Sequence, residues 1–126
     1  AGYTEDFLLR FSNIKNSTFI WPNNVIKVSG TIVGYTMPYI RAKNLCNINP
    51  LLVNLDKLEE ATVKAEKDVK ILTDNKIRLY DVRYNILYTN GKMYVIDTLD
   101  YGNRKVSYEE NRMAIDDELI PRRWLF

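Results

Sequence analysis

Residues 76–98 read KIRLYDVRYNILYTNGKMYVIDT. Residues 86–88 and 93–96 are β-branched and aromatic runs, and Asn90-Gly91 between them is the pair preferred where a tight turn needs positive φ. The pattern predicts an antiparallel hairpin. Because such a hairpin brings its outer ends together, we expect Asn85 and Asp97 to lie close to each other. Two oxygen ligands held in this way can share a hard cation such as Mg²⁺, which retains waters and takes further ligands from phosphates.

The same side chains also have a simpler explanation. Asp and Asn are common at hairpin ends because their side chains bond nearby backbone amides. On this interpretation the protein is a small α+β interaction module without a metal. The two hypotheses differ in geometry: a metal site needs the Asn85 amide oxygen and the Asp97 carboxylate to converge on one point, whereas turn capping directs each into its own loop.

Length and composition indicate one globular domain. The chain has 126 residues, of which 46% are hydrophobic and 27% charged, and this size allows a modest core. The net charge is only +2 and the basic residues are spread along the chain, so neither nucleic acid nor an anionic membrane is expected as a partner. No apolar run approaches the roughly 18–20 residues needed to span a bilayer. We therefore expect a cytoplasmic protein.

Two residue types limit the possible chemistry. The chain has no histidine, which excludes Ser-His-Asp and Cys-His nucleophile systems and every histidine metal site. Its single cysteine, Cys46, precludes an intramolecular disulfide and a cysteine-cluster zinc site, and suits a reducing compartment.

The remaining elements follow from apolar spacing and turn residues, and together they predict an α+β fold. A short helix is expected over residues 5–15 with Thr4 as its N-cap. A second hairpin is expected from residues 25–28 and 31–36 around Ser29-Gly30. Residues 51–74 show the strongest helical periodicity. A weaker helix is expected over residues 108–119, with Asn111, Ile115 and Leu119 on one side and Pro121 limiting its end.

The quoted stretch resembles the catalytic loop and metal loop of protein-kinase-like phosphotransferases. That family has an Asp, then Asn-Ile-Leu, a short hairpin, and a hydrophobic run that ends in Ile-Asp-Phe-Gly or a relative of it. The corresponding residues here are Asp81, Asn85-Ile86-Leu87 and Ile96-Asp97. Two details differ: three residues instead of four separate Asp81 from Asn85, and Leu79-Tyr80 replaces the family's His-Arg.

The resemblance implies a site for Mg²⁺ and ATP. Asn85 and Asp97 would be the metal ligands and Asp81 the candidate catalytic base. Residues 34–40, GYTMPYI, resemble the hinge that binds the adenine of ATP in this family. Met37 would then lie at the gatekeeper position, and the Pro38 carbonyl and the Ile40 amide would face the purine edge. The alternative for Met37 is a simple core residue.

The resemblance extends from near Glu5 to about Gly102, roughly four-fifths of the chain. It includes neither a Gly-rich phosphate loop nor a strand lysine for the phosphates. We therefore expect a single, partial kinase-like domain, with residues 1–40 as the remnant of a small lobe and hinge and residues 41–126 as a reduced large lobe. Its expected partners are a nucleotide and either another protein or a missing N-terminal segment. As this chain it would be weakly active or inactive; the alternative is a catalytically silent pseudokinase-type binding module.

Overall fold

The computed structural model describes residues 3–124, and of residues 117–124 the backbone alone. Helices and antiparallel sheets are both present, which confirms the predicted α+β class. In chain order the elements are α1 (Glu5–Leu8), β1 (Asn24–Val28), β2 (Thr31–Thr36), β3 (Lys43–Asn44), the 3₁₀ turns η1 (Leu45–Asn47) and η2 (Pro50–Leu52), α2 (Leu55–Asp74), β4 (Ile77–Arg78), β5 (Ile86–Thr89), β6 (Lys92–Val95), β7 (Gly102–Asn103) and α3 (Tyr108–Trp124).

Both predicted hairpins form. β5 pairs with β6 and β1 with β2, each antiparallel. The connecting residues have the positive φ angles that the sequence predicted: 42° and 85° at Asn90-Gly91, and 52° and 79° at Ser29-Gly30. A two-residue turn with both φ angles positive matches the twist of the flanking strands.

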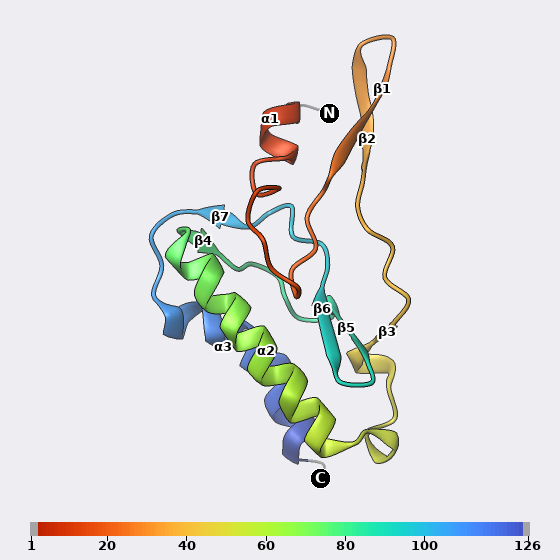
Figure 1. Ribbon diagram of the computed structural model, residues 1–126, viewed down its shortest axis with the longest axis vertical. Coiled ribbons are helices and arrows are strands. Elements are labelled where there is room, and N and C mark those ends of the chain that lie inside the picture. The colour runs from red at the N-terminus through yellow and green to blue at the C-terminus, as the bar shows by residue number, and fades with distance from the viewer. Residues whose placement is uncertain (1–2, 125–126) are drawn as a thin grey trace.

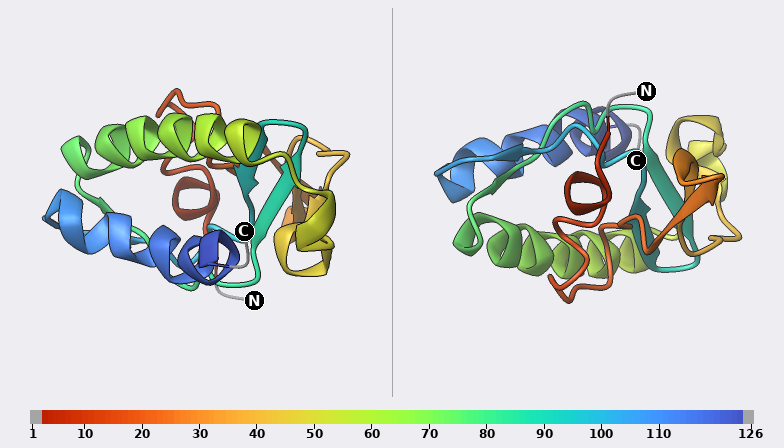
Figure 2. Two further views of the ribbon diagram at one scale, coloured as in Figure 1. Left: turned by 90° about the horizontal axis from the view of Figure 1, so that it is seen from below. Right: turned by 90° about the horizontal axis from the view of Figure 1, so that it is seen from above.

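The two hairpins differ in how they are packed. α2 packs against β6 and β4, and α3 lies alongside α2 (Figure 2). The long helix does not pack against β1 and β2, which project away from the rest of the molecule (Figure 1). Val28 and Val33 are accordingly 60% exposed at this projecting hairpin, since few other elements reach it.

α2 begins at Leu55, four residues later than predicted. The Asn54 side chain accepts a hydrogen bond from the Lys57 amide at 3.1 Å, and an Asn N-cap of this kind defines a helix start. Leu51, predicted as part of the apolar face, belongs to the separate turn η2 and is 83% exposed. From Leu58 to Leu72 the predicted apolar face is buried as expected.

α1 is shorter than the predicted helix over residues 5–15. Thr4 is the N-cap as expected, accepting from the Phe7 amide at 3.1 Å. After Leu8, however, the chain winds through hydrogen bonds to the third preceding residue, among them Ser12 N–H to Leu9 and Ile14 N–H to Phe11. Such tighter turns replace the α-helical pattern beyond the first turn.

α3 is longer than predicted and continues past Pro121 to Trp124. A proline removes one backbone donor, but its fixed φ is itself helical, so the backbone can continue. Asn111 and Ile115 lie on the buried side as expected; the side chain of Leu119 is outside the described part. None of the described helices is long and apolar enough to cross a membrane.

Two short strands that are far apart in the sequence form a small sheet of their own. β4 pairs with β7, with Ile77 opposite Asn103 and Arg78 opposite Gly102. The segment between these strands contains the β5–β6 hairpin and both loops that flank it. The pairing of β4 with β7, together with that of β5 with β6, brings residues 79–85 and residues 96–101 to the same region of the molecule.

Candidate functional site

The outer ends of the β5–β6 hairpin meet as the sequence predicted. The Ile96 amide donates to the Asn85 carbonyl at 2.9 Å, just beyond the last ladder pair, Ile86 and Val95. The backbone of Asn85 therefore contacts the residue immediately before Asp97. Asn85 and Asp97 are brought together by the local strand register.

The side chain of Asn85 is held by its nitrogen. Its Nδ2 donates to the Asp81 carbonyl at 2.7 Å, which fixes the amide plane across the loop. Within the described residues no donor binds Oδ1 of Asn85, so the oxygen is available to an external ligand. This bond directs the Asn85 side chain into its own loop, which is the geometry that turn capping predicts.

Asp81 and Asp97 combine exposure with unusual backbone conformations. Their φ angles are 55° and 58°, and Tyr84 between them in sequence has a φ of 69°. Asp tolerates the left-handed region better than most residues, whereas a tyrosine there is strained. Strain of this kind clusters at functional sites. Among the described residues neither carboxylate has a hydrogen bond or an ion pair, so both are available to a cation.

Tyr101 lies within electrostatic range of both carboxylates. It is 3% exposed, and its hydroxyl has no hydrogen-bond partner among the described residues. Burial raises the pKa of Tyr101 above its ordinary value, and the negative charges of Asp97 and Asp81 raise it further. Because both carboxylates act on one buried hydroxyl, the loop that carries Asp81 lies near the loop that carries Asp97.

Arg10 connects the loop after Asp97 to the N-terminal segment. Its guanidinium donates to the carbonyls of Leu99 at 2.6 Å and Tyr101 at 2.9 Å. It also lies over the rings of Phe7 and Phe11, 3.9 and 4.2 Å from their centroids. A planar group bound on its edge and stacked on its faces has little freedom. The loop after Asp97 is therefore anchored to the segment that follows α1.

A small cavity of about 120 Å³ adjoins Asp97, and Met37 lines it together with Tyr35 and Ile96. The predicted gatekeeper and one predicted metal ligand thus share a wall. Met37 is 44% exposed, so its interpretation as a core residue is wrong. Pro38 and Ile40 line two other hollows, but within the described residues the Pro38 carbonyl and the Ile40 amide have no hydrogen-bond partner and could bind a purine edge.

The metal hypothesis depends on few ligands. In the described part of the chain no three Asp, Glu or Cys side chains gather into a cluster that could hold a metal ion. Asn85 and Asp97 supply one amide and one carboxylate, a set that suits Mg²⁺ only when waters and phosphate oxygens complete the octahedron. The donor types fit such a cation with its nucleotide.

Among the described residues, no lysine or arginine lines this cavity to bind the phosphates. An ion pair joins Glu5 at the start of α1 to Lys27 of β1, with 2.9 Å between Nζ and Oε1. Both side chains are about half exposed, so the pair contributes little to stability. Neither residue lines the cavity beside Asp97.

Sequence reasoning missed Arg10 and Tyr101. Both act through contacts with residues far away in the chain, and nothing in the local pattern marks either one. No protein-family model matches the chain, and no curated protein is significantly similar to it in sequence.

Proposed function

We propose that the chain is a protein-kinase-like domain that binds a nucleotide with Mg²⁺ and is weakly active or inactive in phosphoryl transfer. One observation carries this proposal: the Asn85 amide is held through its nitrogen to the Asp81 carbonyl, and the Asn85 backbone carbonyl accepts from the Ile96 amide, next to Asp97. A pair of oxygen donors next to a second, unpaired carboxylate suits a metal–phosphate site.

Each residue has a role in this proposal. Asn85 and Asp97 would bind the cation, which when bound neutralises charge on the phosphates. Asp81 would accept the proton of an incoming hydroxyl. The Pro38 carbonyl and the Ile40 amide would bind the purine edge, with Met37 behind it. Phosphoryl transfer depends mostly on positioning and charge, so these contacts account for binding before any catalysis.

Weak activity follows from two features of the chain. Neither a lysine nor an arginine lines the cavity beside Asp97 among the described residues, and phosphates without a cationic partner bind less tightly. The loop from Asp81 to Asn85 is one residue shorter than in the family it resembles. Because Asp81 has a left-handed conformation in this short loop, its carboxylate need not point toward a phosphoacceptor.

Calorimetry with ATP tests the proposal. We expect the wild type to bind ATP more tightly with Mg²⁺ than without it, and Asp97→Asn to lose at least tenfold in affinity in the presence of Mg²⁺ only. Asp100→Asn is the matched control, because Asp100 is an exposed acid of the same loop with no assigned role. Equal affinity with and without Mg²⁺, or equal losses in the two variants, would contradict the metal site.

The second candidate function is a catalytically silent, pseudokinase-type binding module. The backbone strain and free oxygens at Asp81 and Asn85 support nucleotide binding as much as they support turnover. Hydrolysis of Mg²⁺–ATP by the wild type and by Asp81→Asn, measured as released phosphate, distinguishes the two functions. Turnover that falls in the variant supports a residual phosphotransferase; binding without turnover in either protein supports the silent module.

A further inference from the structure

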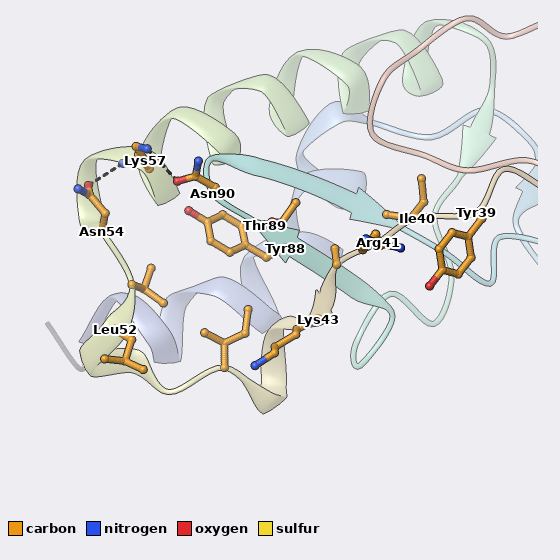
Figure 3. A pocket seen from close by; sticks show the side chains of 13 residues that line it. Tyr39, Ile40, Arg41, Lys43, Leu52, Asn54, Lys57, Tyr88, Thr89 and Asn90 are labelled. Atoms are coloured by element: carbon orange, nitrogen blue, oxygen red, sulfur yellow. Dashed lines mark hydrogen bonds between the residues drawn. The ribbon is translucent and has the colours of Figure 1, made fainter.

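The described part of the chain has a second pocket that is larger than the cavity beside Asp97. It has a volume of about 620 Å³ and lies between residues 39–43, residues 48–54 and the tip of the β5–β6 hairpin. Figure 3 shows Lys57 beside Asn90 at one end, Leu52 and Lys43 along the opposite side, and Tyr39 at the far end. Its volume is within the range of ordinary ligand pockets.

The charge of this pocket has one sign. Arg41, Lys43 and Lys57 line it, and none of its lining residues that the structure describes is acidic. Lys57 donates to a neutral partner, the Asn90 side-chain oxygen, at 2.8 Å. Within the described residues Arg41 and Lys43 have no carboxylate partner. Asp56, the neighbour of Lys57, lines a separate hollow on α2. Three cations without a counter-charge favour an anionic occupant.

The apolar side chains of the pocket indicate that an inorganic anion alone does not account for the site. Leu52 and Tyr39, at opposite ends, are 82% and 86% exposed, and Leu51 beside Leu52 is 83% exposed. Large aliphatic and aromatic side chains this exposed mark interaction sites when they gather around one depression. A phosphate ion would neutralise the cations and leave these side chains in water.

We propose that this pocket is a docking site for an extended peptide segment that carries acidic residues next to aliphatic ones. The acidic side chains would pair with Arg41, Lys43 and Lys57, and an aliphatic side chain would cover Leu52. The lining combines cations with exposed apolar side chains, which suits a short stretch of chain that carries both kinds of side chain. This inference concerns a protein partner, and the pocket shares Ile40 with the proposed nucleotide site.

A peptide array tests the docking site. The array holds peptides with two leucines at varied spacing, flanked by aspartates and glutamates, and the same peptides with the acids replaced by lysines. The purified 126-residue chain is expected to bind members of the acidic set and none of the basic set. Binding should weaken as salt rises, because the contacts include exposed charges. The proposal is overturned if no acidic peptide binds more tightly than its basic counterpart.

Variants then locate the binding. By fluorescence polarisation with the best acidic peptide, Lys43→Glu is expected to weaken binding at least tenfold, and Leu52→Ser to weaken it severalfold. Lys64→Glu, an equal change of charge on another face of α2, is the matched control. Two results contradict the inference: equal losses in Lys43→Glu and Lys64→Glu, or full competition by inorganic phosphate, which would assign the pocket to a small anion.

Discussion

Asn111→Ala is expected to lower the free energy of unfolding by about 3–5 kcal/mol. Asn111 is 1% exposed on α3, and its amide joins two other elements. Its oxygen accepts from the Leu79 amide at 3.0 Å, and its nitrogen donates to the Ile77 carbonyl at 2.9 Å and the Thr73 hydroxyl at 3.0 Å. Truncation leaves a buried donor and a buried acceptor unpaired, each costing about 1–3 kcal/mol.

Urea unfolding followed by circular dichroism measures this change. Met113→Ala is the control, because Met113 is on the same helix and 61% exposed, and it should change stability by less than about 0.5 kcal/mol. A loss below about 1 kcal/mol for Asn111→Ala would show that water replaces the amide and that Asn111 does not tie α3 to the segment before Asp81.

Arg10→Ala is expected to cost about 2–3 kcal/mol, since its hydrogen bonds to the Leu99 and Tyr101 carbonyls are made by a charged, partly buried group. The loop after Asp97 loses its anchor, so affinity for Mg²⁺–ATP should fall as well. Arg10→Lys keeps the charge but loses the Nη1 bond to the Phe7 carbonyl and the planar stacking on the Phe7 and Phe11 rings, and we expect it to lie between the wild type and Arg10→Ala.

Thermal unfolding and ATP calorimetry on the same three proteins check this prediction. Arg104→Ala serves as the control, because Arg104 forms an exposed ion pair with Glu110 of the kind that contributes little. If Arg10→Ala and Arg104→Ala destabilise equally, the Arg10 bonds do not hold the loop. If Arg10→Ala unfolds more easily yet binds Mg²⁺–ATP with wild-type affinity, Arg10 has only a structural role.

Local chemistry made part of the fold predictable. Asn90-Gly91 and Ser29-Gly30 specify tight turns through their backbone preferences alone, and both predicted hairpins form in the structure. The apolar spacing of residues 58–72 likewise specifies one buried helix face. The start of α2 was missed because Asn49, Pro50 and Asn54 each offer a helix start, and the structure uses Asn54.

The parts that depend on distant contacts were not predictable. The pairing of β4 with β7 joins strands of two residues each, too short to leave an alternating pattern in the sequence. The Arg10 anchor spans about ninety residues. For Asn111 a signal existed: an amide on the same helix side as Ile115 indicates a buried polar group that needs partners. Its partners, however, are 32 to 38 residues away.

The candidate site divides in the same way. The closeness of Asn85 and Asp97 followed from hairpin geometry, because the register of β5 and β6 determines it. The cavity lined by Met37 and Asp97 depends on where the end of the β1–β2 hairpin lies relative to the end of β6. No local sequence pattern specifies that arrangement. The pocket lined by Arg41, Lys43 and Lys57 is formed by three segments that are separate in the sequence, and these three cations do not form a run.

In the proposed site, Asn85 and Asp97 bind one hard cation together with a nucleotide. Mn²⁺ accepts the same oxygen ligands as Mg²⁺ and broadens the NMR signals of nearby nuclei, so titration of the ¹⁵N-labelled chain with Mn²⁺ and ATP locates the cation directly. We expect the amide signals of Asp81, Asn85 and Asp97 to broaden first, and only slightly in Asp97→Asn. Broadening centred elsewhere, or none at these residues while the nucleotide is bound, would contradict the proposed site.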